Sequence, residues 1–130
     1  MRVIERPDHF TISTDRLEET RLFYEDLGFQ VGPRPAFPVP GLWLYLADHP
    51  ALHVVEVERM PEVRRGALDH MAYRATGLRE TVAWAKARGL ACNLIRAPRP
   101  YSTWQLFFED PNGVEVELDF DPSEEGPEPA

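Results

Sequence analysis

Hydrophobic and polar positions follow the same succession twice along this chain. A short run with strand-like alternation comes first, at His9–Ser13 and again at His70–Arg74. Each run leads into a stretch with helical spacing that ends at a glycine, Gly28 or Gly89, 19 positions after the opening histidine (9 to 28 and 70 to 89). A unit of this size cannot bury its apolar face alone, so the repeat indicates one fold built from two copies.

The two helical stretches each present one apolar stripe, but different residues are expected to begin them. In the first, Asp15 with Glu18 three positions later forms a capping-box pattern. In the second, Thr76 is the expected cap. The stripes consist of Leu17, Phe23, Tyr24 and Leu27 in the first helix and Leu78, Val82 and Ala85 in the second. We therefore expect two amphipathic helices that end at Gly28 and Gly89.

Three strand-like segments follow each glycine. In the first copy they cover residues 29–35, 42–47 and 52–57, with a turn at 48–50; in the second they cover 91–96, 103–109 and 114–120. The turn Asp110-Pro111-Asn112-Gly113 suits a hairpin connection. Each copy thus predicts a βαβββ module, and the chain predicts an α+β fold of two tandem modules that form a cup-shaped mixed sheet with the helices outside.

The length of 130 residues is sufficient for one domain with a substantial core. We expect the first module at about residues 6–57, a linker at 58–67 and the second module at about 68–120. The segment 121–130 contains four acidic residues and three prolines, a composition that predicts a frayed tail.

Charge and composition narrow the classes of partner. A net charge of −8 argues against nucleic acid, because phosphate binding needs a basic surface. No apolar run approaches the ~20 residues that span a bilayer, and the N-terminus has no signal-peptide pattern. The single Cys92 cannot form an internal disulfide, which fits a reducing compartment. A cytoplasmic protein with a small-molecule partner and no membrane or nucleic-acid partner is expected.

Three histidines and a glutamate occupy similar places in the repeat. His9 and His70 open the first strand of each copy, whereas His53 and Glu117 lie near the middle of the last strands. First and last strands can direct these side chains to one centre. Imidazole and carboxylate groups together suit divalent Zn, Ni, Co, Fe or Mn better than Ca or Mg. We therefore predict that His9, His53, His70 and Glu117 bind a divalent metal ion.

Glu56 is an alternative to His53 as the fourth ligand. It follows His9 by 47 positions, as Glu117 follows His70, whereas His53 follows His9 by 44. Residues 53 and 56 lie on opposite faces of a strand, so only one of them can point inward. A shorter turn before the last strand of the first copy would account for His53, and the spacing leaves both alternatives open.

These segments resemble the vicinal oxygen chelate superfamily, which comprises glyoxalases, bleomycin-resistance proteins and extradiol dioxygenases. The matching segments are Asp8-His9-Phe10, Phe23-Tyr24-Glu25-Asp26-Leu27-Gly28-Phe29, Leu68-Asp69-His70-Met71-Ala72 and Phe108-Glu109-Asp110-Pro111-Asn112-Gly113-Val114-Glu115-Val116-Glu117-Leu118. The resemblance implies metal ligands at His9, His70 and Glu117, and it favours His53 over Glu56 for the fourth place. Glyoxalase I-like members have a second carboxylate there, so His53 departs from their pattern.

The resemblance implies a glyoxalase-like lyase or isomerase that acts on a small oxygenated metabolite. The metal would stabilise a developing oxyanion, with Glu117 as ligand and proton shuttle. One alternative is an Fe(II) ring-cleaving dioxygenase with His9, His70 and Glu117 as a facial triad. Another is a metal-free small-molecule binding or resistance protein. The candidate substrate-binding residues are Tyr45, Tyr101 and Trp104. A homodimer is also expected, since open sheet edges favour association.

Overall fold

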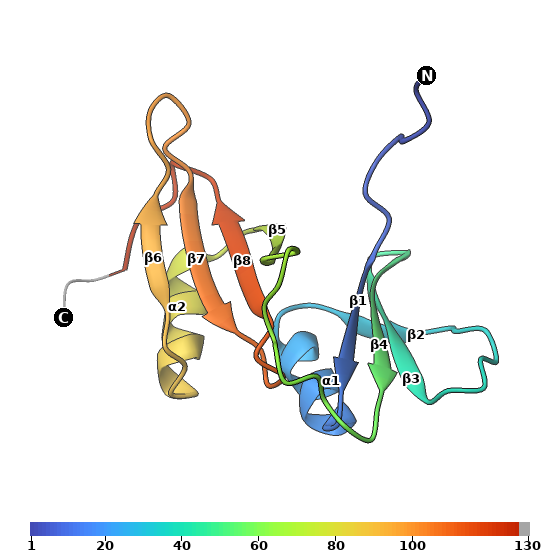
Figure 1. Cartoon of the computed structure of the whole chain (residues 1–130). Helices are drawn as coiled ribbons and strands as arrows, with labels where there is room; N and C mark the ends of the chain where they lie inside the picture. The colour runs from blue at the N-terminus through green and yellow to red at the C-terminus, as the bar shows by residue number, and fades with distance from the viewer. Residues whose placement is uncertain (128–130) are drawn as a thin grey trace. The chain divides into compact units, whose positions relative to one another are not determined.

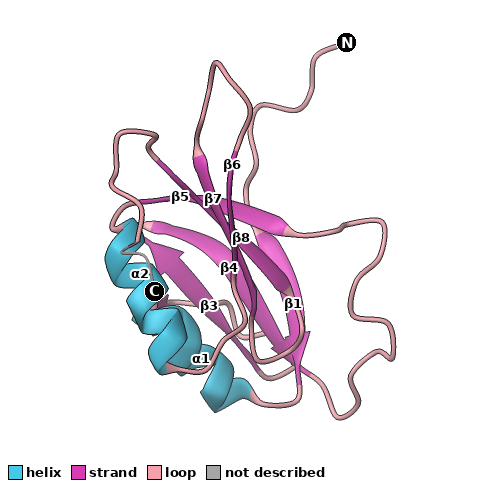
Figure 2. Cartoon of the chain, turned by 90° about the vertical axis from the view of Figure 1, so that its left-hand side faces the viewer, coloured by secondary structure: helices cyan, strands magenta, loops and turns pink. Residues whose placement is uncertain are grey.

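A computed structural model describes residues 1–127 (Figure 1). The chain divides into two compact units, Met1–Arg64 and Arg65–Ala130. We call these the first and the second module, and each contains one helix and four strands within the described residues. Figure 2 distinguishes the helices from the strands by colour.

The first module has the chain order βαβββ. Its elements are β1 (Phe10–Thr14), α1 (Leu17–Asp26), β2 (Gln30–Gly32), β3 (Gly41–Leu46) and β4 (His49–Glu56). The strands form a sheet in the order β1-β4-β3-β2, in which β1 and β4 are parallel and the other neighbours are antiparallel. The first and last strands of the module therefore lie side by side.

The second module repeats this topology. Its elements are β5 (Met71–Ala75), α2 (Leu78–Ala87), β6 (Asn93–Arg96), β7 (Trp104–Glu109) and β8 (Glu115–Phe120). The sheet order is β5-β8-β7-β6, again with the first and last strands parallel. The α+β class and the two βαβββ modules are confirmed, and neither four-stranded sheet is closed.

Each sheet has a face that packs on its helix and an open face. In the first module the Thr14 hydroxyl of β1 lies 3.1 Å from that of Thr20 in α1. In the second module the rings of Trp84 in α2 and Phe108 in β7 meet edge to face at 5.8 Å between centroids. The fully buried side chains include Phe23, Tyr24, Leu44, Leu52 and Val54 in the first module and Leu78, Leu106, Val116 and Phe120 in the second. Burial of each such apolar side chain contributes about 1.5–3 kcal/mol.

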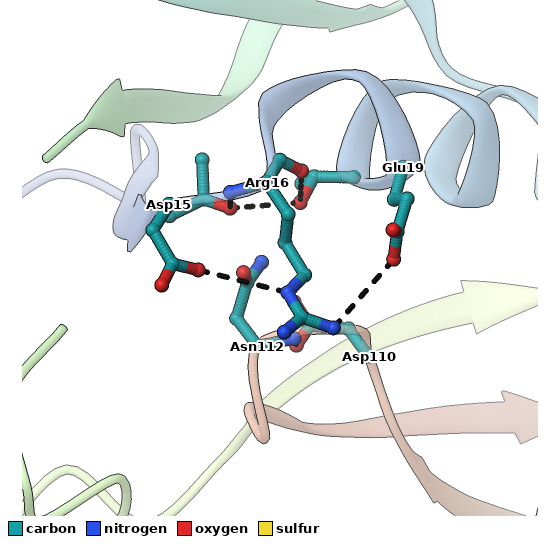
Figure 3. Close-up of polar contacts among 7 residues, drawn as sticks. Asp15, Arg16, Glu19, Asp110 and Asn112 are labelled. Carbon is teal, nitrogen blue, oxygen red and sulfur yellow. Dashed lines mark hydrogen bonds and ion pairs between the residues drawn. The ribbon is translucent and has the colours of Figure 1, made fainter. Parts of the chain in front are cut away.

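The start of α1 differs from the predicted capping box. Arg16 is the N-cap residue, and no side chain caps the helix. The backbone N–H of Arg16 donates to the Thr14 hydroxyl at 2.9 Å. The Arg16 guanidinium lies 3.6 Å from Asp15 and 3.7 Å from Glu19 (Figure 3). The Asp15 and Glu18 prediction is wrong because the helix begins one residue later than the pattern requires.

The start of α2 depends on a residue far along the chain. Gly77, at φ 90°, is the N-cap in place of the predicted Thr76. The Glu124 carboxylate accepts the backbone N–H of Gly77 at 3.1 Å and that of Leu78 at 2.8 Å. A carboxylate at a helix N-terminus satisfies unpaired amides and favours the helix dipole. Sequence reasoning missed this cap because its acceptor lies 46 residues after Leu78.

The segment predicted to be a frayed tail is anchored as far as the structure describes it. The Trp104 indole N–H donates to the Glu124 carbonyl at 2.9 Å, and Arg79 donates to the Gly126 carbonyl at 2.7 Å. These contacts tie Glu124 and Gly126 to the second module, the frayed tail stays a prediction, and residues 128–130 lie outside the described residues. Acidic and Pro-rich composition suggested solvation, but one of its carboxylates serves as the α2 cap.

Turns and helix ends mostly follow the sequence signals. Both helices end before glycines with left-handed backbones, Gly28 at φ 111° and Gly89 at φ 70°, as predicted. The predicted turn at residues 48–50 is shorter than expected, because β4 begins at His49. Ala47, at φ 56°, makes the reversal, and the pairing of β3 with β4 shifts register between Leu44 and Leu46.

Candidate functional site

Strand register identifies which residues of the two modules are equivalent. In the first module His53 pairs with Thr11, and in the second Glu117 pairs with Ala72. His9 and His70 each lie two residues before those partners, so His53 is the structural counterpart of Glu117. Glu56 pairs with Thr14, so strand alternation places it on the face opposite to His53, and it is exposed. This register favours His53 over Glu56 as the residue that matches Glu117, although it does not test metal binding.

The first module brings His9 and His53 together in a column of stacked rings. Their ring centroids lie 3.7 Å apart with planes inclined by 12°. Trp43, the cross-strand neighbour of His53, stacks against it at 4.0 Å and 13°. His53 thus lies between two rings. Burial, and the positive charge that His9 can carry, lower the pKa of His53. Sequence reasoning did not identify Trp43 as the neighbour of His53.

Hydrogen bonds determine which ring nitrogen each histidine presents. Nδ1 of His9 lies 2.6 Å from an Asp8 carboxylate oxygen, and Nδ1 of His70 lies 2.8 Å from that of Asp69. An ionised carboxylate only accepts, so Nδ1 carries the hydrogen and Nε2 holds the lone pair of the neutral ring. His53 differs, because its Nε2 donates to the Pro50 carbonyl at 3.1 Å. In the neutral rings, the lone pair that can bind a metal is therefore on Nε2 in His9 and His70, whereas it is on Nδ1 in His53.

The second module brings His70 and Glu117 into direct contact. Nε2 of His70 lies 2.9 Å from Oε1 of Glu117. Glu117 is buried, and its other oxygen accepts from the Gln105 amide at 3.2 Å. With the Asp69 partner on Nδ1, a neutral His70 would direct a lone pair at a carboxylate. A positive charge, either a proton on Nε2 or a metal ion, resolves that repulsion. The donor chemistry of this pair therefore fits a divalent metal.

The protonation behaviour of His70 follows from the same contacts. The Asp69 hydrogen bond raises the pKa of His70 against the opposing effect of desolvation, and the charge of Glu117 raises it further. In turn, the His70 hydrogen bond lowers the pKa of Asp69. Asp69 thus holds the ring in place and stabilises its positive charge.

Further carboxylates surround this pair on the open face of β8. Glu115, Glu117 and Asp119 alternate with the buried Val116, Leu118 and Phe120 along the strand. Burial, with the neighbouring Glu117, raises the pKa of Asp119 to about 6. Among the described residues, Oδ1 of Asp119 is buried without a hydrogen-bond partner.

A second possible set of metal donors overlaps the predicted one. One ligand atom from each of Asp69, His70 and Glu115 lies within 4.8 Å of the others. The Arg65 guanidinium forms an ion pair with Glu115 and lies 3.7 Å from Asp69. Glu115 was not predicted as a ligand. Its position two residues before Glu117, on the same strand face, was the available signal.

The three predicted substrate-binding residues lie in different settings. The Tyr45 hydroxyl donates to the Pro33 carbonyl, and its ring packs so closely on Gly32 that a Cβ there would lie 2.5 Å from it. Tyr101 lies in a loop and is 76% exposed. Trp104 shares the α2-facing side of β7 with Phe108, and Glu124 accepts its N–H. These contacts give no support for a ligand role of Trp104, and the three-residue set stays a prediction.

The repeat, the topology and the histidine pairs agree with a comparison at the level of sequence families. A profile of the Glyoxalase/Bleomycin resistance protein/Dioxygenase superfamily matches residues 6–118, so the chain belongs to this superfamily. Members generally use metal ions, bind small-molecule substrates and often form dimers. Among curated proteins, none matches the sequence.

Solved structures share the fold at low sequence identity. A protein from Bacillus anthracis assigned to the glyoxalase family is 21% identical, with a TM-score of 0.74 over 93% of this chain and 98% of that one. A glyoxalase family protein from Enterococcus faecalis is 25% identical, with a TM-score of 0.65 over 88% and 97%. A virulence protein from Salmonella typhimurium is 17% identical, with a TM-score of 0.63 over 92% and 99%. Within residues 1–127, neither helix has the length and apolar character needed to cross a bilayer.

Proposed function

We propose that the chain is a glyoxalase-like metalloenzyme, a lyase or isomerase that acts on a small oxygenated metabolite. The observation that carries the proposal is the 2.9 Å approach of His70 Nε2 to the buried Glu117 carboxylate. Asp69 occupies the other ring nitrogen, so this contact calls for a cation. Membership of a superfamily that generally uses metal ions makes a divalent metal the preferred candidate.

In this proposal each residue of the second-module pair has a distinct role. A bound divalent metal supplies Lewis-acid stabilisation of an oxyanion that develops on the substrate. His70 binds through Nε2, and Asp69 fixes its tautomer. Glu117 acts as a ligand and as the group that accepts and returns a proton, while Gln105 orients its second oxygen.

His9 and His53 are the proposed remaining ligands, through Nε2 and Nδ1 respectively. Their contacts with Asp8 and Pro50 leave those nitrogens as the acceptor atoms of neutral rings. The sequence-based prediction that all four side chains bind one ion stays a prediction. Metal stoichiometry tests it, because one shared ion gives one equivalent per chain that depends on residues of both modules.

Elemental analysis of the purified protein and its variants is the direct test. We expect one equivalent of Zn, Ni, Co, Fe or Mn, with loss of about 100-fold or more in affinity for His70→Ala and Glu117→Ala, since each removes a direct ligand. Glu80→Ala is the matched control, because Glu80 is an exposed glutamate of α2 outside the proposed ligand set. The proposal fails if the wild-type chain binds no stoichiometric metal, or if both ligand variants retain it.

A metal-free binding protein is the second candidate, and the ring column of the first module favours it. The Trp43 ring, which stacks on His53, also lies 6.3 Å from the Phe37 ring at an inclination of 45°, and Phe37 is about half exposed. Such rings can hold a planar ligand. A ligand that binds with the same affinity after chelation of all metal would favour this function. Oxygen consumption with catechols would instead indicate the Fe(II) dioxygenase alternative.

A homodimer is also part of the proposed functional state. Each module has a sheet with unclosed edges, and the superfamily often forms dimers. Light scattering during size-exclusion chromatography tests this directly. A mass near twice 14.9 kDa is expected, and a monomeric mass across the working concentration range would contradict it.

A further inference from the structure

A cavity of about 550 Å³ opens in the second module, at the end of its sheet nearest the β7–β8 turn. It lies between the segment Gly89–Asn93 that follows α2 and the facing ends of β7 and β8. Small-molecule sites commonly have volumes of about 300–1,000 Å³. The cavity is therefore large enough for a metabolite-sized ligand.

The lining of this cavity has one sign of charge. Among its ten lining residues are three carboxylates, Glu109, Asp110 and Glu115, and no lysine or arginine. Asp110 is buried, and one of its carboxylate oxygens accepts the Asn112 and Val114 backbone N–H groups at 2.8 and 3.0 Å. Its role is therefore to hold the turn, which leaves Glu109 and Glu115 as the carboxylates to consider for a ligand.

Glu109 is the carboxylate best placed to receive a ligand. Glu115 already pairs with Arg65, whereas Glu109 is exposed and forms no ion pair within residues 1–127. The two glutamates are cross-strand neighbours, so their charges lie close together on the lining of the cavity. Like charges in proximity favour a bound cation and oppose a bound anion.

An aromatic ring connects the cavity with the histidine site. Phe107 lines the cavity and is the cross-strand neighbour of Glu117. Its ring also meets the His70 ring edge to face at 5.9 Å. An aromatic ring and a carboxylate in one cavity are both groups that attract an organic cation. The cavity thus adjoins the His70–Glu117 pair within a single module.

We propose that this cavity binds a small organic cation, such as a protonated amine with an apolar body. As an extension that rests on the proposed function, the cation is the charged end of the substrate, whose oxygen atoms lie toward His70 and Glu117. Substrates and thiol cofactors with carboxylates at this end are disfavoured, because they would meet the negative charge of Glu109.

Three probes of similar size and different charge test the charge preference. Benzylamine, benzyl alcohol and benzoate are titrated into the full chain, both metal-loaded and chelated, while backbone ¹H–¹⁵N chemical shifts are followed. We expect benzylamine to bind about ten-fold more tightly than benzoate, with benzyl alcohol between them, and the shifts to concentrate at residues 89–93 and 107–109. Benzoate binding as tightly as benzylamine, or shifts located elsewhere, would overturn the proposal.

Matched variants locate the effect. Glu109→Gln should weaken benzylamine about three-fold, a typical value for one exposed ion pair, and should leave benzyl alcohol unchanged. Glu80→Gln removes the same charge from an exposed position in α2 and should change neither. Cys92→Phe narrows the cavity and should weaken both ligands. Equal effects of Glu109→Gln and Glu80→Gln would refute the role of Glu109.

The two proposals can fail independently. Metal content is measured on the same samples, and neither Glu109→Gln nor Cys92→Phe changes a proposed metal ligand. A preference for benzylamine without stoichiometric metal would retain the cation site and reject the metalloenzyme. Stoichiometric metal with a preference for benzoate would reject the cation site and retain the metalloenzyme.

Discussion

The two modules have the same topology and the same pairing at the site residues, yet the chemistry of their open faces differs. In the first, His53 lies in a column of rings between His9 and Trp43. In the second, the equivalent Glu117 lies among carboxylates and contacts His70. Trp43 and Phe107 occupy equivalent positions beside these residues, as cross-strand neighbours. The first face is aromatic and weakly charged, and the second is strongly acidic.

This difference shows that the fold and the site have separate determinants. The apolar positions that face each helix maintain the sheet, and they are similar in the two modules. The positions that alternate with them are free to differ without altering the register. One duplicated backbone can therefore supply a supporting ring stack on one sheet and anionic groups on the other.

The largest expected effect concerns the apolar face that the modules share. Leu44 and Leu106 are fully buried on β3 and β7. Leu44→Ala and Leu106→Ala should each lower the free energy of unfolding by about 2–5 kcal/mol. Urea denaturation measures both values. If one variant loses an amount within this range and the other an amount outside it, the shared topology does not confer similar core stability.

The next effect concerns the two Asp-His pairs, which the modules have in common. Asp69→Asn and Asp8→Asn should each weaken metal binding about 10–100-fold, because an amide can also donate and no longer fixes the Nδ1–H tautomer. Competition with a chelator measures the affinities, and ¹⁵N spectra of the rings report the tautomers. If the tautomers stay unchanged in both variants, the positioning role of the aspartates is wrong.

These results also separate what the sequence predicts from what it does not. The helix ends at Gly28 and Gly89 and the βαβββ order along the chain arise from local signals and from the repeat, whereas the His53–Glu117 equivalence is given by the strand register. The contributions of Glu124 and Trp43 depend on residues brought together only by folding. Spacing alone could not choose between His53 and Glu56. Hairpin length changes the number of residues between the first and last strands without changing which residues of those two strands pair.

A smaller effect distinguishes the two aromatic neighbours. Trp43→Leu removes the ring stacked on His53, and Phe107→Leu removes the ring at the edge of His70. We expect Trp43→Leu to weaken metal binding about three- to ten-fold, in line with about 0.5–1.5 kcal/mol for an aromatic pair, and Trp43→Phe to restore most of it. Phe107→Leu should have less effect, since its contact is more distant. The reverse order would contradict the stacking argument.

The smallest effect compares the two helix starts. Glu124→Ala removes the carboxylate that accepts two backbone amides of α2 and should cost about 1 kcal/mol. Arg16→Ala removes two exposed ion pairs beside α1 and should cost less, about 0.5 kcal/mol. Thermal denaturation of both variants provides the comparison. A larger loss for Arg16→Ala would mean that α1, rather than α2, depends on its charged partners.

The Glu124 cap changes where the second module ends for anyone who expresses it separately. A fragment cut after Phe120 would include every strand, yet it would lack the acceptor for Gly77 and Leu78 and the carbonyls that receive Trp104 and Arg79. The boundary that preserves these contacts lies after Gly126. The C-terminal end of a second-module fragment should therefore be chosen to keep these hydrogen bonds, and not to coincide with the end of β8.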